Sequence, residues 1–312
     1  MSINDVSKLH SLQQEHHAAE LGDEERAGIR ESWFDESTVD FWRHRHMYEQ
    51  IEPVAEAFAD SRWLTVGDGR FGLDAVRIKK LFGIKNICPS DIAEPLLAAG
   101  KERGLFDQYF VENMETLSFE DNAFDVIFCK EAFHHCPRPW LAFYELCRVA
   151  RTAVILIEPA ATLRIARPRR PQQLTKLISA IAGRKDYIED GSKIERAGTA
   201  YEDSGNYLYR LSREEFEQVA RGANLPAISW KPFMDTHIPE CEFAPAEPGN
   251  PIFEKLRHSI EKQEALHKKF PDEVALPMGA AVAWLKPVSD ELQKKLEASG
   301  HQVVDTRNPM NV

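Results

Sequence analysis

Apolar and polar positions follow one another in blocks that predict strands and helices in alternation. An apolar run at residues 63–66 leads into a glycine-rich turn, and residues 73–82 then carry apolar side chains at helical spacing. Gly83 is suited to end that helix, and a second short strand is expected at residues 85–88. The segment therefore predicts a strand, a turn, a helix and a second strand.

The same alternation continues to about residue 160 and resumes later in the chain. Helices are expected at 92–103 and 140–149, and strands at 108–111, 126–129, 153–157, 227–238 and 280–285. The runs at 126–129 and 153–157 are continuously apolar, as in strands that are buried on both faces. Short connections between such elements predict an α/β fold with a doubly wound, mostly parallel sheet.

Two segments precede the first strand. Residues 1–37 form a polar arm with little periodicity, and its histidines His10, His16 and His17 are expected to be exposed, with metal binding as the alternative. Residues 38–60 have a broad apolar stripe, and Pro53 predicts a kink or two abutting helices there. The polar side of this segment, residues 43–46, is expected to face solvent, with a place at the mouth of a pocket as the alternative.

These patterns divide the chain into six parts. They are the arm (1–37), the N-terminal helix (38–60), a core around the glycine turn (61–160), a substrate-cap insertion (161–210), the C-terminal part of the sheet (211–287) with a helical insertion near 250–270, and a C-terminal helix and tail (288–312). We interpret the two insertions as caps for substrate enclosure or for contact between subunits, so a homodimer is one expectation.

Composition narrows the class of protein. The 312 residues carry 39 basic and 50 acidic side chains, a net charge of −11 that argues against a general nucleic-acid binder. Five cysteines without a CxxC spacing favour a reduced, cytoplasmic protein with no metal site of the usual kind. Neither an apolar signal core nor a run of about 18 apolar residues is present, so no membrane span is expected. Peripheral contact with anionic lipid remains open because a basic cluster lies at 164–170.

The glycine turn and the acid that follows it predict a nucleoside pocket. Gly67, Gly69 and Gly72 let the backbone approach a ligand, the next helix offers unpaired N–H groups, and Asp91 at the second strand tip can accept bonds from ribose hydroxyls. Asp91 with Glu94 also fits a helix cap. The glycine spacing literally matches the dinucleotide fingerprint, which leaves an NAD(P)-dependent Rossmann oxidoreductase or epimerase as an alternative. Short-chain members of that class need Tyr-x-x-x-Lys, and no tyrosine here has that partner.

With these residues in view, the stretch from about 60 to 160 resembles a class I S-adenosylmethionine-dependent methyltransferase, in particular the group with small-molecule or glycan-type acceptors. The turn at 67–72 resembles motif I, and Asp91 resembles the acid that holds the ribose. Residues 112–119 resemble the acidic segment before the fourth strand, and residues 129–135 resemble that strand's exit toward the methyl donor. The resemblance implies S-adenosyl-L-methionine as cofactor and a seven-stranded sheet.

The resemblance also implies the cofactor contacts. They are expected from Gly67, Asp68, Gly69, Gly72, Asp91, Ile92, Asn113, Met114 and Lys130. Within the family, the position of Asn113 contacts the adenine amino group and the position of Met114 lends a backbone N–H. Two positions depart from the family pattern, since Thr65 replaces an acid that helps to hold the donor's amino group and Phe71 replaces a glycine. Asp68 is the candidate replacement for that acid, and the departures leave a catalytically silent binding protein as a further alternative.

Methyl transfer from a sulfonium depends mainly on alignment, and a base is needed when the acceptor is an alcohol. The candidate catalytic residues are His134, His135 and Glu131 at the fourth strand's exit, with capping or packing as the alternative for the histidines. Candidate substrate contacts are Glu158, Tyr201, Asn206, Tyr207 and Arg164. The Tyr- and Asn-rich segment 201–210 and the basic cluster favour a sugar-like or anionic small molecule, methylated on O or N. Core tyrosines and a solvated charge run are the alternatives.

Overall fold

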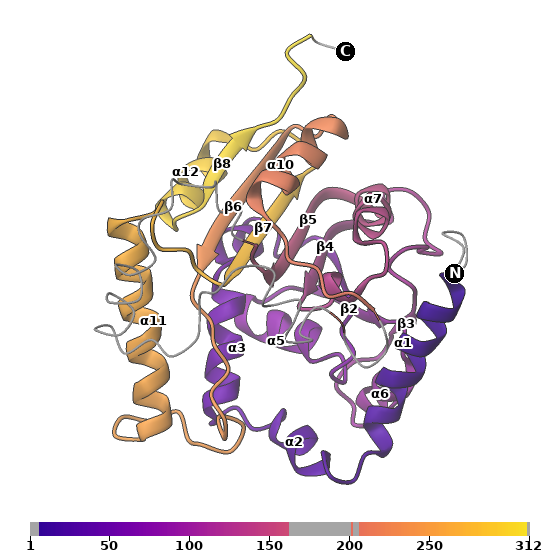
Figure 1. Ribbon diagram of the computed structural model, residues 1–312. Helices are drawn as coiled ribbons and strands as arrows, with labels where there is room; N and C mark the ends of the chain where they lie inside the picture. The colour runs from indigo at the N-terminus through magenta and orange to yellow at the C-terminus, as the bar shows by residue number, and fades with distance from the viewer. Residues whose placement is uncertain (1–5, 162–200, 202–205, 311–312) are drawn as a thin grey trace.

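The computed structural model describes residues 6–161, 201 and 206–310, which form one mostly parallel sheet with helices around it (Figure 1). Its strands are β1 (Arg62–Val66), β2 (Asn86–Asp91), β3 (Phe110–Val111), β4 (Phe124–Lys130), β5 (Ala150–Pro159), β6 (Ala227–Phe233), β7 (Met278–Trp284) and β8 (Gln302–Asp305). The order across the sheet is β3-β2-β1-β4-β5-β7-β6-β8. Strands β1 to β5 pair in parallel, whereas β7 runs antiparallel to both β5 and β6. The expected doubly wound α/β fold is confirmed.

The sheet has eight strands in the described residues, one more than the seven expected. The extra strand, β8, pairs antiparallel with β6 in the segment for which only a helix and tail were predicted. It follows α12 (Asp290–Ala298) after Gly300, whose φ of +98° turns the chain back. A strand with two apolar residues, Val303 and Val304, is too short to show a period in the sequence.

The described helices are α1 (Ser7–Ala19), α2 (Ala27–Ser32), α3 (Val39–Glu49), α4 (Glu52–Ala57), α5 (Leu73–Phe82), α6 (Glu94–Glu102), α7 (Pro139–Val149), α10 (Arg213–Gly222), α11 (Pro251–Lys269) and α12, with 3-10 turns η1 (Glu20–Gly22) and η2 (Phe133–His135). Pro53 lies in the first turn of α4, so the predicted break between two abutting helices is confirmed. None of the helices in this part of the chain has both the length and the apolar composition that a membrane crossing needs.

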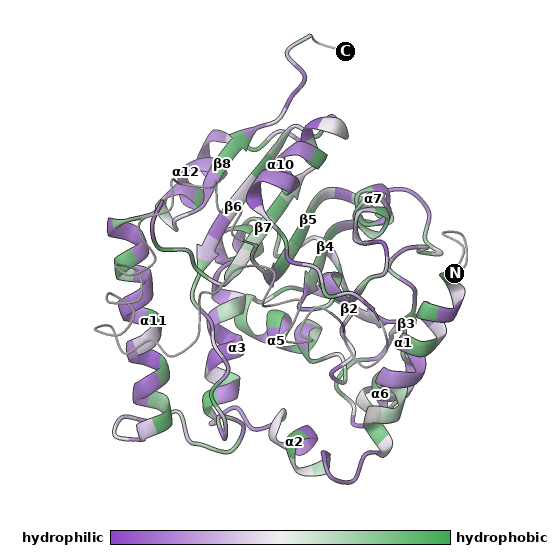
Figure 2. Ribbon diagram, viewed as in Figure 1, coloured by the Kyte–Doolittle hydropathy of each residue, from purple (hydrophilic) through white to green (hydrophobic). Residues whose placement is uncertain are grey.

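Side chains of the central strands alternate between two cores. Leu64, Ile127 and Val154 face the layer of α7 and α10. Trp63 and Phe128 face the opposite layer, formed by α3, α4, α5 and α12. Figure 2 shows the central strands mostly in the apolar colour, while α11 and α12 contain many residues in the polar colour. The sheet is therefore buried on both faces, as a parallel sheet requires.

The strand register brings the expected site residues to one edge of the sheet. Val66 at the end of β1 pairs with Ser90 on one side and Cys129 on the other. Asp91 pairs with Val111, so β2 and β3 end at the same level. The glycine turn and the segments after β2, β3 and β4 therefore meet at the carboxyl ends of the strands, where open α/β sheets bind ligands. The predicted insertion at 161–210, with its basic cluster, lies for the most part outside the described residues.

Candidate functional site

A cavity of about 320 Å³ lies at the carboxyl ends of the strands. It is lined by all three candidate catalytic residues, His134, His135 and Glu131. It is also lined by every expected cofactor residue except Gly72, namely Gly67, Asp68, Gly69, Asp91, Ile92, Asn113, Met114 and Lys130. The volume is within the usual range for a small-molecule site.

The glycines of the turn serve two different purposes. Gly67 has a φ of +74°, and a Cβ there would lie 2.2 Å from the Cβ of Ala132, so this glycine lets the turn pack against the exit of β4. A Cβ on Gly69 would lie 3.1 Å from Oδ2 of Asp91, so the bare backbone of the turn faces that carboxylate. A Cβ on Gly72 would lie 2.4 Å from the ring of Phe106, so Gly72 serves packing rather than the cavity.

Phe71 occupies a left-handed conformation with a φ of +57°, at the position where the resembled family has a glycine. Such a conformation costs a residue with a side chain about 1–2 kcal/mol. The ring is buried against Trp33 and Phe34 and does not line the cavity. The space beside Asp91 is therefore left open, and the strain at Phe71 is offset by aromatic packing.

Asp91, the last residue of β2, is buried and lines the cavity. Its Oδ1 accepts the N–H of Ala93 at 2.7 Å, whereas Ala93 itself is the N-cap of α6, so the predicted cap by Asp91 is not formed. Burial raises the pKa of the Asp91 carboxyl to about 6 despite the backbone hydrogen bonds. A buried carboxylate that faces a cavity is stabilised by donors such as the hydroxyls of a sugar.

Asp68 lines the cavity but its carboxylate is engaged by the protein. Oδ1 accepts the N–H of Asp74, and Oδ2 accepts the N–H of Ala75 and the hydroxyl of Thr65, at 2.8–3.0 Å. Burial, with the nearby charge of Asp74, raises the pKa of Asp68 to about 7. Asp68 therefore stabilises the first turn of α5 by accepting its backbone N–H groups, and Thr65 donates to the same carboxylate.

A cluster of buried and half-buried charges lies beside the glycine turn. Lys130 Nζ lies 3.5 Å from Oδ1 of Asp74, 3.4 Å from Oε2 of Glu131 and 3.3 Å from Nδ1 of His44. Arg70 Nη1 lies 2.9 Å from the other ring nitrogen of His44. Burial would raise the pKa of Glu131, but the surrounding cations lower it to about 2, so this carboxylate is ionised at neutral pH.

His44 and Arg43 are buried, so the prediction that residues 43–46 all face solvent is wrong for these two. His44 is 1% exposed, and burial together with the charges of Lys130 and Arg43 lowers its pKa well below the usual value. Arg43 forms an ion pair with Asp235 at 2.7 Å. The helix pattern identified a polar face but could not show that α3 turns that face toward the glycine turn.

The segment after β3 is held by its own polar side chains. Asn113 Oδ1 accepts the N–H of Glu115 at 2.9 Å, and Met114 packs beside Gly67 and Cys136. Glu115 is fully buried and accepts two bonds from Arg138, from the backbone N–H and from Nε, both at 2.7 Å. These contacts fix the turn that presents Asn113 and Met114 to the cavity.

Glu158 lies behind the histidine pair rather than in the cavity. Its Oε2 lies 2.5 Å from Nδ1 of His134, and its Oε1 accepts the N–H groups of Ala132 and Phe133. The rings of His134 and His135 are 4.1 Å apart. Because Glu158 is fully buried, it orients His134 and does not line the cavity itself.

A row of three tyrosine rings lies next to the cavity. Tyr201 and Tyr207 are 64% and 37% exposed, and the ring of Tyr207 also packs edge-on against Tyr209. The backbone N–H of Tyr209 donates to the carbonyl of His134, and its hydroxyl donates to the carbonyl of Pro137, a residue of the cavity lining. Neither Tyr201 nor Tyr207 lines the cavity.

The other two substrate candidates are placed differently from the exposed tyrosines. Asn206 is buried and is not part of the cavity lining. Arg164 lies outside the described residues.

Gln13, Arg70 and Asp74 also line the cavity, although the sequence gave them no role there, and so does His17, which was expected to be exposed. Gln13 and His17 come from α1, in the segment for which the sequence predicted only a polar arm. Arg70 lies in the glycine turn and Asp74 in the first turn of α5. Their closeness to Gly69 in the sequence is the one feature from which a place at the cavity could have been predicted.

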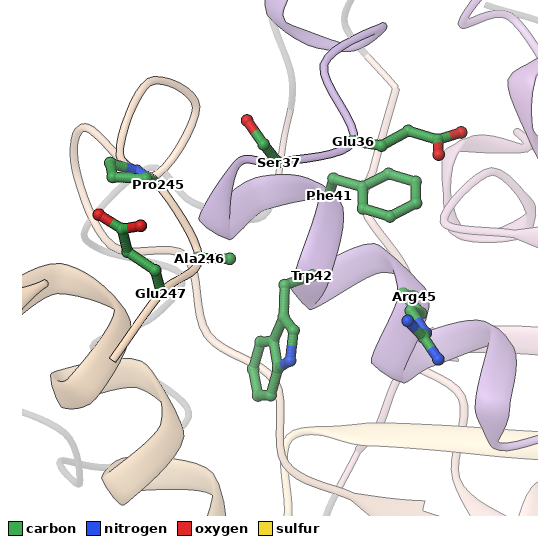
Figure 3. Close-up of a pocket in the computed structure, with 8 residues that line it drawn as sticks. All are labelled: Glu36, Ser37, Phe41, Trp42, Arg45, Pro245, Ala246 and Glu247. Carbon is green, nitrogen blue, oxygen red and sulfur yellow. The ribbon is translucent and has the colours of Figure 1, made fainter. Parts of the chain in front are cut away.

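A second hollow, of about 360 Å³, lies between the start of α3 and residues 245–247 (Figure 3). Two of its three charged side chains are paired, Glu36 with Lys80 and Arg45 with Glu49, and it contains none of the expected site residues. Separately, His237, Cys241 and Glu242 are the one group in the described ranges whose metal-ligating atoms all lie within 4.8 Å of one another. The convergence of predicted residues therefore favours the cavity at the glycine turn as the functional site.

Residues 64–157 match the family model described as a methyltransferase domain. Among solved structures, the magnesium protoporphyrin IX methyltransferase of Synechocystis PCC 6803, with bound SAH, has a TM-score of 0.50 and 9% identity, covering 89% of this chain and 100% of that one. An S-adenosylmethionine-dependent methyltransferase of Thermotoga maritima has a TM-score of 0.46 and 15% identity, with coverage of 90% and 100%. The YcgJ protein of Bacillus subtilis has a TM-score of 0.46 and 16% identity, with coverage of 79% and 100%.

The likeness to the Synechocystis enzyme, at 9% identity, concerns the fold alone. A search of curated proteins found no significant match.

Proposed function

We propose that this chain, a class I S-adenosylmethionine-dependent methyltransferase, methylates a hydroxyl or amine of a small, sugar-like acceptor. The domain match over residues 64–157 and the strand order support the enzyme class and its cofactor. The acceptor and the roles of individual residues are our proposal. The observation that carries it is the pairing of His134 with the buried Glu158 at the edge of a nucleoside-sized cavity.

The cavity residues suit the cofactor. Asp91 accepts the ribose hydroxyls, because its carboxylate faces the bare backbone of Gly69 with no side chain between them. Asn113 and Met114 border the adenine, and the mixed charges beside the turn, with Arg70 and Glu131 among them, match an amino-acid zwitterion. When bound, S-adenosylmethionine supplies a methyl group on a positively charged sulfur.

His134 acts as the base when the acceptor is a hydroxyl. Its Nδ1–H donates to Glu158, so Nε2 is the ring atom that takes the acceptor's proton. The carboxylate then stabilises the imidazolium that forms. Because Glu158 also holds the N–H groups of Ala132 and Phe133, the base is fixed in place before any ligand arrives.

The tyrosine row supports a sugar-like acceptor. Tyr201 and Tyr207 present exposed aromatic faces, and Tyr209 connects the row to His134 and Pro137 at the cavity. Aromatic faces combined with hydroxyl groups suit a ring that has both apolar C–H faces and polar edges. We therefore place the acceptor between this row and His134.

The test has two parts. Calorimetry with S-adenosylhomocysteine should give a Kd in the micromolar range that Asp91→Ala weakens at least about tenfold, since one charge-assisted bond is worth roughly 1.5–3 kcal/mol. Methyl-labelled donor should then label acceptors from a panel of sugars and nucleotide-sugars, and His134→Ala should reduce the rate by about a hundredfold or more while leaving donor binding within about threefold. Labelling of simple amines or carboxylates instead of sugars would overturn the acceptor class, and absence of donor binding by folded protein would overturn the cofactor roles.

A further inference from the structure

The N-terminal helix α1 lies along the cavity instead of extending away from the domain. Gln13 and His17 line the cavity, and Gln13 Nε2 donates to the backbone carbonyl of His135 at 3.3 Å. One turn earlier, His10 Nε2 lies 3.1 Å from Oε2 of the buried Glu115. Figure 1 shows α1 beside α6, with which it is in contact. The helix therefore spans from the segment after β3 to the histidine pair after β4.

The docking of α1 is polar. Gln13 is its one buried residue, while Leu12 is exposed. A 13-residue helix is marginal in water on its own, so α1 depends on its contacts with the domain. Those contacts fall on residues of the cavity wall, which makes the docked position of α1 sensitive to what the cavity holds.

A chain of contacts joins α1 to the proposed base. The ring of His17 packs edge-on against His135, with centroids 6.0 Å apart. His135 packs against His134, which is bonded to Glu158. The residue that α1 touches through both Gln13 and His17 is thus the direct neighbour of the group that we propose as the base.

We propose that α1 is a lid that completes this cavity, and that Gln13 and His17 are positioning residues that it contributes at the reacting end. The inference rests on the proposed function, because it takes the cavity as the donor and acceptor site. A ligand that contacts α1 stabilises its docked position, and by linkage a docked α1 slows release of the ligand. Exclusion of water by the closed helix would also protect the sulfonium and strengthen the interactions around His134.

The chain offers matched controls for each lid residue. Gln14 is next to Gln13 on the same helix but is exposed, and His16 is the exposed neighbour of His17. Each pair therefore makes the same change in side chain and helix propensity, with and without the cavity contact. Gln13→Glu keeps the shape of Gln13 but replaces the N–H donor to His135 with a carboxylate oxygen that carries negative charge and cannot donate when ionised.

The experiment measures dissociation of S-adenosylhomocysteine from the full chain by stopped-flow, together with hydrogen exchange of residues 7–19. We expect Gln13→Ala, Gln13→Glu and His17→Ala to release the ligand about three to ten times faster than the wild type, with melting temperatures within about 2 °C of it. Gln14→Ala and His16→Ala should stay within about twofold. In the wild type, saturating ligand should slow exchange in α1 at least fivefold.

The outcomes separate the two proposals. Ligand binding with equal release rates in the lid and control variants, and unchanged exchange in α1, would overturn the lid and leave the methyltransferase function standing. Absence of ligand binding by folded wild-type protein would overturn the proposed site, and the lid with it. A lowered melting temperature in the lid variants alone, with unchanged release rates, would show that α1 is only a structural support.

Discussion

His134 and Glu158 lie 2.5 Å apart, from Nδ1 of the ring to Oε2 of a carboxylate that is fully buried. Because the other carboxylate oxygen accepts the N–H groups of Ala132 and Phe133, Glu158 holds both the ring and the loop that carries it. The sequence suggested Glu158 as a contact for the substrate. Its buried position makes it the support of the proposed base instead.

Replacing Glu158 should therefore affect stability as well as activity. Glu158→Ala leaves two backbone N–H groups without their acceptor, and we expect unfolding by urea to show a loss of roughly 3 kcal/mol. Glu158→Gln keeps one acceptor oxygen and should cost about half as much. Glu120→Ala, at an exposed position, is the control and should change stability by less than about 0.5 kcal/mol. Equal stability of all three variants would contradict the support role.

The close approach of Gly67 to Ala132 predicts a specific cost for a methyl group. Gly67→Ala combines a left-handed φ with a 2.2 Å clash, and we expect a loss of about 3 kcal/mol in stability and roughly tenfold in affinity for S-adenosylhomocysteine. Gly83 has a similar φ of +68° but open space around it, so Gly83→Ala should cost only about 1–2 kcal/mol and leave affinity unchanged. Denaturant unfolding and calorimetry check both, and similar losses of affinity in the two variants would count against the clash.

The raised pKa of Asp91 predicts a pH dependence with a defined sign. The folded protein keeps a proton on Asp91 up to about pH 6, while the unfolded chain releases it near 3.8, so this group favours folding at low pH and that contribution is lost as pH rises through about 6. Ribose hydroxyls bind the ionised form, so affinity for S-adenosylhomocysteine should rise as pH increases through about 6. Binding near pH 6 should release protons.

Calorimetry in buffers of different ionisation enthalpy measures this proton release. Asp91→Asn should bind more weakly and release fewer protons near pH 6 than the wild type does. Asp68, whose pKa is about 7, is present in both proteins, so the difference between them isolates Asp91. Identical proton release by the two proteins would contradict the assignment of Asp91 to the ribose.

Phe71 tests whether backbone strain or packing dominates at the turn. Phe71→Gly relieves about 1–2 kcal/mol of left-handed strain but removes a buried ring that contributes about 3–5 kcal/mol. We expect a net loss of about 2–3 kcal/mol in urea unfolding. Affinity for S-adenosylhomocysteine should stay within about threefold because Phe71 does not line the cavity. Stabilisation by this change would mean that strain outweighs packing, contrary to our expectation.

The elements of the core could be predicted because their signals are local. The strand, glycine turn and helix from Arg62 to Phe82 follow from apolar spacing and from the conformational freedom of Gly67. The strand-tip position of Asp91 follows in the same way. The capping of α10 by Ser212, whose hydroxyl accepts the N–H of Glu215, is local in the same sense, because it joins residues three positions apart.

Contacts between segments that are distant in the chain could not be predicted from the sequence. Lys130 and His44 are 86 positions apart, yet their side chains meet beside the turn. Likewise, His10 and Gln13 lie in a polar segment that the sequence predicts to be solvated. Their roles follow only from the docking of α1, in which His10 contacts Glu115 and Gln13 donates to His135.

The sequence by itself determined the alternation of strands and helices in the core, the position of the glycine turn and the family that the core resembles, because each depends on residues close together in the chain. Tertiary structure alone decided the partners of the charged groups. Asp68 holds α5 and Glu158 supports His134, because a buried carboxylate is stable only beside the donors that the packing brings near it. Which donor that is depends on the whole fold, and no local pattern records it.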